Sequence, residues 1–438
     1  MITEGTMSTD IRSHTWALPG LEVTEVTLPV PLDHQDDTSA RLELFARIYA
    51  DPEGTDRPYL VYLQGGPGSE APRSVGPDSP PWLARALREH RVIMLDQRGT
   101  GRSTPVGPDV ALPEGAIDGA ATLREATPAQ QAQYLTHFRA DAIVRDAELL
   151  REHLGVDTWS LLGQSFGGFT TLRYLSAAAA SVETALFTGG IPSLGPDMES
   201  VYRTTWEGMA ARSERHWARF PGDRDRMRAL ADRAEAGRLR LPDGQKVGVE
   251  RLRRIGMLLG RSQGQEQLHY LLGLDPDSPA FAHDLAGALP FGGRNPIYAV
   301  IHESCWADGT VTDWAAERAM PGTVREDPTL LAGEHVHREL FTEDPELQVW
   351  AEAAELLAQH PWPRLYDEGA LRAADVPGAA AVYYDDAYVP REYSMATAAL
   401  LPRLRTWVTS EYEHGGLRSS GQVVLDHLLD LAKGRREA

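Results

Sequence analysis

Several features that would point to other classes of protein are missing from this sequence. Cys305 is the only cysteine, so an intrachain disulfide and a cysteine-rich metal site are both excluded. No run approaches the roughly 18 consecutive apolar residues that a membrane span needs. Lysine and arginine number 43 against 63 aspartate and glutamate residues. The resulting formal charge of −20 argues against a nucleic-acid-binding surface, which would need a basic face.

The first residues, Met1 to Asp10, are polar and contain no apolar secretion segment. We therefore expect a soluble, cytoplasmic protein in which residues 1–12 form a loose tail. The 438 residues are 42% hydrophobic and 24% charged, which is an ordinary globular balance. This length and composition predict a sizeable core, organised as one large domain with an insertion or as two domains.

The first half of the chain alternates strand patterns with helix patterns. Leu21–Val30 and Leu42–Tyr49 are predicted to pair as an antiparallel hairpin. Short runs that are apolar throughout predict strands buried on both faces of a parallel sheet; these runs are Tyr59–Leu63, Val92–Leu95, Trp159–Leu162 and Ala185–Thr188. Apolar residues spaced by three and four from Ile143 to Leu154 predict a helix. The alternation indicates an α/β fold with a mostly parallel central sheet.

The pattern changes in the middle of the chain. Residues 192–375 have helical spacing and few strand signals. Strand patterns resume at Ala379–Tyr384 and Arg405–Thr409, and a last helix is predicted over Gly421–Lys433. We interpret this as an α/β core, residues 1–191 and 376–438, interrupted by a mainly helical cap, residues 192–375.

A candidate nucleophile follows the third buried run. Residues 163–167 read Gly-Gln-Ser-Phe-Gly, which fits the G-x-S-x-G pattern of a nucleophile elbow. In that sharp strand-to-helix turn, small residues on either side of the serine avoid clashes, and the helix N-terminus favours developing negative charge. Because an apolar strand precedes the match and a helix pattern follows it, we predict that Ser165 is a catalytic nucleophile.

A nucleophilic serine needs a base, and the base needs an orienting carboxylate. In a site of this kind the acid and then the histidine follow the serine, each after a later strand. Asp385 and Asp386 stand at the end of one later strand, and His414 stands after the next. The predicted triad is therefore Ser165, His414 and one of these two aspartates.

The loop at residues 64–68, Gln-Gly-Gly-Pro-Gly, follows the first buried strand. A tetrahedral intermediate needs backbone N–H donors aimed at its oxyanion. We predict that Phe166, directly after the nucleophile, supplies one donor and that Gly65 or Gly66 supplies the other. The loop matches neither of the glycine-rich patterns that bind phosphates.

The histidines of the predicted cap do not indicate a metal site. His335 and His337 form an H-x-H pair without a clear third ligand. His302 and His360 precede the candidate acids, which is the wrong order for the triad. We therefore expect no metal and no other cofactor.

Together these motifs resemble the α/β-hydrolase fold, and more narrowly the larger subgroup of the prolyl aminopeptidases, or proline iminopeptidases. Residues 96–103, Asp-Gln-Arg-Gly-Thr-Gly-Arg-Ser, match that family's D-Q-R-G-x-G-x-S signature. Residues 64–68 are similar to its H-G-G-P-G loop, with Gln64 in place of histidine. Residues 386–390 resemble its D-x-x-x-P stretch, which carries the triad acid, so the resemblance favours Asp386 over Asp385.

The resemblance implies a serine aminopeptidase that releases N-terminal proline from small peptides through an acyl-enzyme intermediate. It also implies cap glutamates that bind the cationic N-terminus of the substrate. Glu303 and Glu334 are the candidates, and Trp306 is expected near the pocket. A carboxylesterase or tripeptidyl-type aminopeptidase on the same fold, and a catalytically silent binding module, stay open as alternatives.

Overall fold

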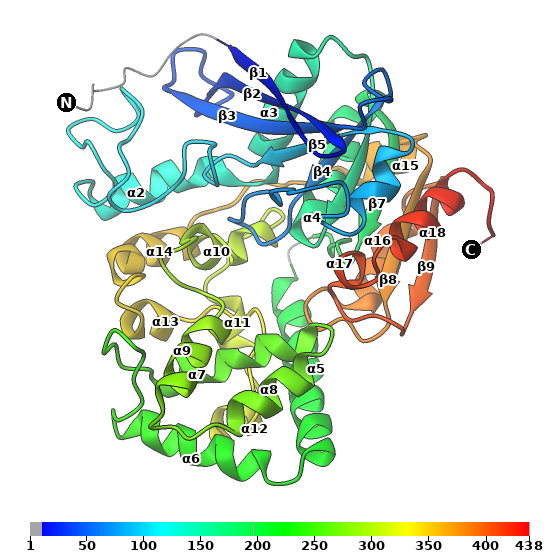
Figure 1. Cartoon of the computed structure of the whole chain (residues 1–438). Helices are drawn as coiled ribbons and strands as arrows, with labels where there is room; N and C mark the ends of the chain where they lie inside the picture. The colour runs from blue at the N-terminus through cyan, green and yellow to red at the C-terminus, as the bar shows by residue number, and fades with distance from the viewer. Residues whose placement is uncertain (1–10, 196, 438) are drawn as a thin grey trace.

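Nine strands form one mixed sheet in the part of the chain that this computed structural model describes, residues 11–195 and 197–437 (Figure 1). In chain order they are β1 (Arg12–Leu18), β2 (Leu21–Pro31), β3 (Arg41–Ala50), β4 (Tyr59–Leu63), β5 (Arg91–Asp96), β6 (Trp159–Gln164), β7 (Val182–Thr188), β8 (Gly378–Tyr383) and β9 (Leu404–Thr409). Their spatial order is β1-β2-β3-β5-β4-β6-β7-β8-β9. The pairs from β1 through β3 to β5 are antiparallel, and all pairs from β5 to β9 are parallel. The prediction of an α/β fold with a mostly parallel sheet is confirmed.

The antiparallel edge of the sheet confirms one prediction and corrects another. β2 and β3 pair as the predicted hairpin, with Val26 opposite Ala46. β1 was not predicted, because its side chains are almost all exposed and it has no buried apolar face to create a pattern. Since β1 begins at Arg12, the predicted loose tail of residues 1–12 is wrong at that residue, and residues 1–10 lie outside the described part of the chain.

Two helical layers cover the parallel part of the sheet. The helices α1 (Leu83–Leu87) and α18 (Val423–Ala432) pack on one face, and α3 (Ala140–His153) and α4 (Phe166–Ala178) pack on the other. Along β4, Leu60 joins the first layer and Val61 the second, because successive side chains of a strand point to opposite faces. This two-sided burial explains why the central strands are apolar throughout.

A mainly helical segment separates β7 from β8 along the chain, although the two strands are neighbours in the sheet. Its helices are α5 (Met198–Arg219), α6 (Asp223–Glu235), α7 (Val249–Arg253), α8 (Gly264–Leu272), α9 (Pro279–Ala288), α10 (Ile297–Val300), α11 (Ala315–Arg318), α12 (Gly322–Glu326), α13 (Arg338–Glu343), α14 (Ala351–Ala358) and α15 (Glu368–Ala373). In Figure 1 most of them form the green and yellow layer below the sheet. α15 already packs on α4, and the exact residue limits of the cap stay a prediction.

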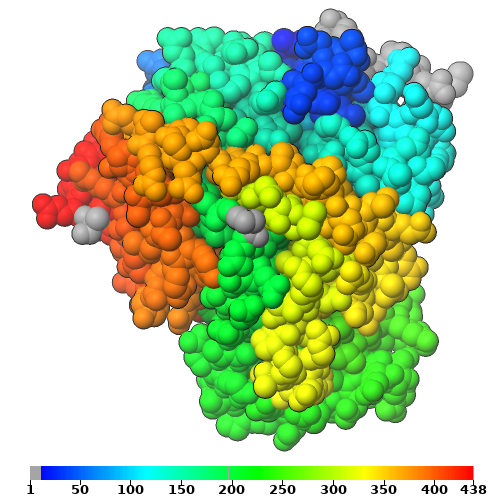
Figure 2. Space-filling model, turned by 180° about the vertical axis from the view of Figure 1, so that it is seen from behind, coloured from blue at the N-terminus to red at the C-terminus, as the bar shows by residue number. Residues whose placement is uncertain are grey.

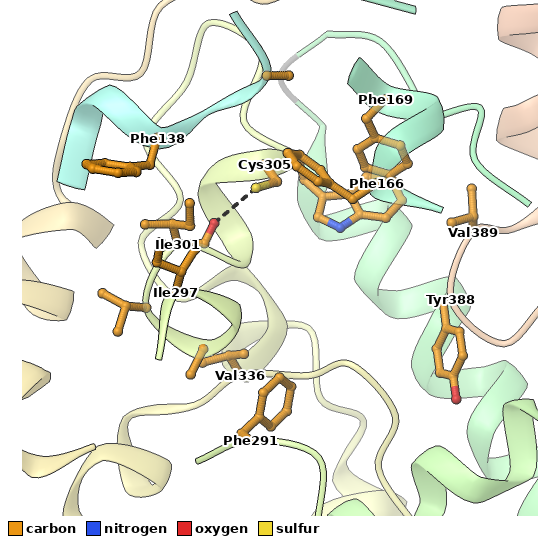
Figure 3. Packing of buried hydrophobic residues seen from close by; sticks show 14 of the residues in the cluster. Phe138, Phe166, Phe169, Phe291, Ile297, Ile301, Cys305, Val336, Tyr388 and Val389 are labelled. Carbon is orange, nitrogen blue, oxygen red and sulfur yellow. Dashed lines mark hydrogen bonds between the residues drawn. The ribbon is translucent and has the colours of Figure 1, made fainter. Parts of the chain in front are cut away.

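The cap and the α/β core share one continuous apolar cluster. Phe169 on α4 packs edge-on against Trp306 of the cap, with ring centroids 4.6 Å apart. Figure 3 shows Phe166 and Phe169 close to the cap segment that carries Cys305. Figure 2 shows the gold part of the cap, which contains α14, beside the cyan part of the core, which contains α2 (Pro128–Leu135). The cap is therefore anchored to the core by buried contacts.

Two short helices follow the last strands: α16 (Arg391–Ala398) comes after β8, and α17 (Gly416–Ser419) comes after β9. The predicted C-terminal helix is present as α18. Within residues 11–195 and 197–437, no helix combines the length and the apolar character needed to cross a bilayer.

Candidate active site

Ser165 occupies the tight turn between β6 and α4. Its backbone has φ 55° and ψ −125°, a region that side-chain-bearing residues rarely adopt. The turn is held by two hydrogen bonds, from the Ser165 N–H to the carbonyl of Thr188 at 3.1 Å and from the Gly168 N–H to the carbonyl of Ser165 at 2.7 Å. The residue directly before a helix is thus kept in a strained conformation, which is the geometry that a nucleophile elbow requires.

Close backbone contacts explain the glycines around this serine. A Cβ atom at Gly167 would lie 1.8 Å from the carbonyl oxygen of Leu63, and one at Gly163 would lie 2.4 Å from the carbonyl oxygen of Gly167. A Cβ atom at Gly190, after β7, would lie 2.3 Å from the carbonyl oxygen of Ser165. These positions accept only glycine unless the strands move apart, so the motif is a steric condition for the turn.

His414 and Asp386 form a hydrogen-bonded pair. The His414 Nδ1 lies 2.8 Å from Oδ2 and 2.9 Å from Oδ1 of Asp386. The backbone N–H groups of Tyr388 and Val389 donate to Asp386 Oδ1 at 2.9 and 3.0 Å and fix the orientation of this carboxylate. Burial alone would lower the pKa of His414, but the Asp386 carboxylate outweighs burial, and the pKa of His414 is raised above its ordinary value.

Asp385 does not take part in this pair. Its side chain is 56% exposed and forms an ion pair with Arg215 at 3.3 Å, whereas the Asp386 side chain is 1% exposed. Two adjacent aspartates at the end of β8 therefore point to different surroundings, and only Asp386 meets His414.

Ser165 and His414 line the same pocket, which has a volume of about 490 Å³. The pocket lies between the core and the cap, since Gly66 and Trp82 contribute from the core and Met257 contributes from the cap. This cleft brings the predicted nucleophile and the predicted base to one surface.

The glycine-rich loop after β4 lies directly against the nucleophile. A Cβ atom at Gly65 would come within 2.8 Å of the Ser165 Cβ, so only glycine allows this approach, and Gly66 has a φ of 123°. The two segments are neighbours because β4 and β6 are adjacent parallel strands. Phe166 is the first residue of α4, where N–H groups have no partner within the helix. The predicted oxyanion donors are thus placed on both sides of Ser165.

The Asp-Gln-Arg-Gly signature supports this loop instead of contacting the pocket. The Gln97 side chain donates to the carbonyl of Gln64 at 3.1 Å. Arg98 is fully buried and binds Asp146 through Nε at 2.7 Å and the carbonyl of Leu32 at 2.8 Å. These contacts join the loop after β5 to the glycine-rich loop, to α3 and to the end of β2.

Of the two cap glutamates, the structure brings only Glu334 to Ser165. The Glu334 side chain lines the 490 Å³ pocket together with Ser165 and His414 and accepts a hydrogen bond from the Tyr298 hydroxyl. Desolvation in this pocket raises the pKa of Glu334, although His414 opposes the rise. Glu334 therefore places a carboxylate beside the reacting groups.

Glu303 is a correction to the sequence-based expectation. Its carboxylate lines a different, smaller cavity and accepts hydrogen bonds from the backbone N–H groups of Ala315 at 3.2 Å and Ala316 at 2.8 Å, at the start of α11. Burial raises the pKa of Glu303 to about 7. The Glu303 carboxylate therefore accepts the free N–H groups at the N-terminus of helix α11, within the cap domain. It is not among the residues that line the pocket of Ser165.

His302, the residue before Glu303, has the wrong place in the chain order for a triad base, but it lies next to Ser165 in the structure. His302 and Trp306 line a small niche next to Ser165, together with Glu334 and Cys305. His302 is 3% exposed, and its ring nitrogens make no hydrogen bond of good geometry with any residue in the described ranges. Burial lowers the pKa of His302 to about 4, although the backbone of Glu334 opposes this shift, so the ring is neutral at pH 7.

Trp306 lies at the wall of this niche. Cys305, the neighbouring residue, is buried, and burial raises the pKa of its thiol to about 12. Figure 3 shows its Sγ directed at the carbonyl of Ile301, at 3.3 Å. A thiol with this pKa is protonated at neutral pH and is not a nucleophile.

The H-x-H pair of the cap has structural partners. His335 stacks on Trp206 with ring centroids 3.7 Å apart and lies 2.9 Å from the Thr205 hydroxyl. His337 faces the Glu250 carboxylate at 3.6 Å. Over the described ranges no group of three or more histidine, cysteine, aspartate or glutamate side chains is arranged to hold a metal ion.

Comparisons with known proteins agree with this geometry. A family profile described as alpha/beta hydrolase fold matches residues 58–240. A proline iminopeptidase of Aeromonas sobria is 41% identical over 95% of this chain and 98% of its own length. A proline iminopeptidase of Aspergillus aculeatus is 28% identical over 94% of each chain. The chain therefore belongs to the proline iminopeptidase family, within the α/β-hydrolase fold.

Proposed function

We propose that this protein is a serine aminopeptidase that releases N-terminal proline from peptides. The observation that carries the proposal is the meeting of Ser165, His414 and the Glu334 carboxylate in one pocket. The first two are the parts of an acyl-transfer centre, and the third is a partner for a cationic amino terminus. Membership of the proline iminopeptidase family supports the same activity.

In the proposed reaction, the Ser165 hydroxyl attacks the carbonyl carbon of the substrate's first residue. His414 donates its Nδ1–H to Asp386, which leaves Nε2 free to accept the serine proton. The resulting imidazolium is stabilised by the Asp386 carboxylate. It then returns the proton to the departing amine, and a prolyl ester of Ser165 remains until water hydrolyses it.

The oxyanion that forms during this attack needs donors that are already in place. We assign them to the backbone N–H of Phe166 and to the N–H of Gly65 or Gly66. Glycine leaves room for the loop after β4 to approach Ser165, so donors on the two segments would lie on either side of the nucleophile.

The substrate's ammonium group is assigned to Glu334. A carboxylate that is partly removed from water gains more from an ion pair than an exposed one does. The Tyr298 hydroxyl orients the carboxylate. Phe166, Phe169 and Trp306 line a niche of only about 10 Å³, the size of one water molecule, so the pyrrolidine ring would lie in the main pocket at the edge of this niche.

A pair of substrates tests the exopeptidase proposal. Prolyl-2-naphthylamide should be cleaved with a kcat/KM about 10- to 100-fold higher than its N-acetyl derivative, because acetylation removes the charge that Glu334 binds. The rates are measured by release of the naphthylamine. Equal turnover of the two compounds would favour a carboxylesterase or a general hydrolase instead.

Two glutamate variants test the ammonium site. Glu334→Gln should raise KM for prolyl-2-naphthylamide about 10- to 100-fold and leave hydrolysis of a neutral ester such as naphthyl acetate almost unchanged. Glu303→Gln is the matched control, since it is also an isosteric change in the cap but lies outside the pocket. A rise in KM with Glu303→Gln instead would restore the expectation that Glu303 binds the substrate.

The sequence adds three expectations to this proposal. They are a cytoplasmic location, small peptides as the substrates, and the absence of nucleic-acid partners. Cell fractionation and a rate series over peptides of increasing length would test the first two.

A further inference from the structure

Two arginines line the mouth of the same pocket and have no role in the proposed chemistry. Arg261 comes from the cap, directly after the 3-10 helix η3 (Arg254–Gly260). Arg418 comes from the core, on α17 and four residues after His414. Both side chains are exposed, so they stand at the solvent end of the cleft.

Neither arginine is neutralised by an acidic neighbour. Among residues 11–195 and 197–437, no carboxylate lies within 4.0 Å of Arg261 or Arg418. Nearby arginines behave differently, since Arg212 pairs with Glu413 at 2.8 Å and Arg215 pairs with Asp385 at 3.3 Å. In a chain with a formal charge of −20, two unpaired cations facing one cleft favour an anionic ligand.

The charges of the pocket therefore differ in exposure as well as in sign. The Glu334 carboxylate is half-buried and lines a niche together with Ser165, whereas the two guanidinium groups are exposed. Desolvation raises the pKa of Glu334, and Arg261 is among the groups that oppose this rise, so the two charges interact. A short unblocked peptide has the complementary order, with an ammonium group at its first residue and a carboxylate at its last.

The size of the pocket fits such a peptide. Extended chains advance about 3.3–3.6 Å per residue, so the carboxylate of a di- or tripeptide lies within roughly 10 Å of its amino terminus. A volume of about 490 Å³ is in the range of small-molecule sites. A longer peptide would carry its carboxylate past the mouth of the cleft.

We propose that Arg261 and Arg418 form a carboxylate subsite for the free C-terminus of di- and tripeptide substrates. The inference rests on the proposed aminopeptidase function and adds a preference for short peptides that end in a carboxylate. Guanidinium groups suit this task because they bind carboxylates through two parallel hydrogen bonds. One arginine comes from the cap and one from the core, so the bound peptide would bridge the two.

The test compares peptides that differ only at the C-terminus. For the wild-type protein, kcat/KM for Pro-Gly and Pro-Gly-Gly should exceed that for Pro-Gly-amide and Pro-Gly-Gly-amide by about 10- to 100-fold, as expected for charge-assisted hydrogen bonds. Arg261→Gln and Arg418→Gln should each reduce this ratio, and the double variant should bring it close to one. Arg215→Gln, an exposed arginine of the cap that does not line the pocket, should leave the ratio unchanged.

Prolyl-2-naphthylamide separates this proposal from the function on which it rests. If the wild-type protein does not cleave the naphthylamide, the aminopeptidase function fails. If it cleaves the naphthylamide but turns over the acids and amides equally, only the carboxylate subsite fails. A ratio that survives in the double variant also overturns the subsite, and a loss confined to one single variant removes the other arginine from it.

Discussion

Asp385 and Asp386 are adjacent in the chain and yet differ in every property that matters for catalysis. The Asp386 carboxylate is removed from water, oriented by two backbone N–H groups and bound to His414. The Asp385 carboxylate is in solvent beside Arg215. The chain turns after β8, so these two neighbours lie in different surroundings. Asp386 is a buried hydrogen-bond partner of the imidazole, and Asp385 is a surface charge.

Replacing each aspartate by asparagine should separate the two. His414 must be neutral to accept the serine proton, so kcat/KM falls when the pH drops through the pKa of His414. Asp386→Asn removes the anion that raises this pKa, so the acid limb of the profile should move to lower pH, and kcat should fall about 10³- to 10⁴-fold. Asp385→Asn should alter neither quantity by more than about twofold. The check is a pH profile with prolyl-2-naphthylamide, and the reverse pattern would make Asp385 the triad acid.

The sequence predicts some residues of the site through motifs and chain order, but not all. Ser165 and His414 follow from a turn signature and from chain order, and the choice of Asp386 over Asp385 follows from the family resemblance. Glu303 and His302 are neighbours on one short helical turn, and which of them faces the pocket depends on packing against α11. Arg261 and Arg418 belong to no motif, and only the tertiary fold brings them to one cleft.

At the scale of elements, the site depends on how closely β4, β6 and α4 approach one another. Gly167 on α4 packs against the last residue of β4, with no room for a methyl group. The same approach holds the glycine-rich loop beside Ser165. Packing between these elements therefore sets the distance between the nucleophile and the predicted oxyanion donors.

Gly167→Ala should destabilise the protein by about 3 kcal/mol or more, because the new Cβ would lie 1.8 Å from a backbone oxygen that is fixed in the sheet. Gly208→Ala is the matched control in the helix α5, where a new Cβ meets no atom within 4 Å. This change should stabilise the protein by about 1 kcal/mol, since alanine favours helix more than glycine does. Denaturant unfolding of both variants measures the difference, and equal effects would contradict the steric account.

Deeply buried strands were predictable from the sequence, and β9 was also predicted although it is only partly buried. The runs that became β4 to β8 are apolar because both of their faces are covered, and β2 and β3 have one clearly buried face. β1 has neither, and no pattern marked it. For the cap domain, the sequence predicted a mainly helical segment but not the limits of each helix. Those limits depend on helix-capping residues and turns, which the spacing of apolar residues does not encode.

At the scale of the molecule, the cap holds the histidine loop as well as covering the pocket. Arg212 on α5 pairs with Glu413, the residue before His414, and donates to the carbonyl of Leu259 at 2.9 Å. Tyr388, beside the His414 ring, donates to the carbonyl of Met257 in the cap at 2.6 Å. The position of the base is therefore set by both parts of the molecule.

Arg212→Met should weaken this link and change the titration of the base. Arg212 is a cation that lowers the pKa of His414, so its removal should raise that pKa and move the acid limb of kcat/KM to higher pH. The free energy of unfolding should fall by about 1–2 kcal/mol, because Glu413 is partly exposed and water can replace part of the lost pair. Arg215→Gln on the same helix, whose partner is in solvent, should change neither measurement. A limb that moves to lower pH would contradict this assignment.

The neighbouring strands β7 and β8 impose an order on biosynthesis. β7 ends at Thr188, and its partner begins only at Gly378, after the entire cap has been made. At about 5–20 residues per second, a ribosome needs roughly 10–40 s to synthesise the intervening segment. Throughout this interval the edge of β7 in the nascent chain has no neighbouring strand. Such an edge can pair with other chains, and chaperones that bind nascent chains would protect it.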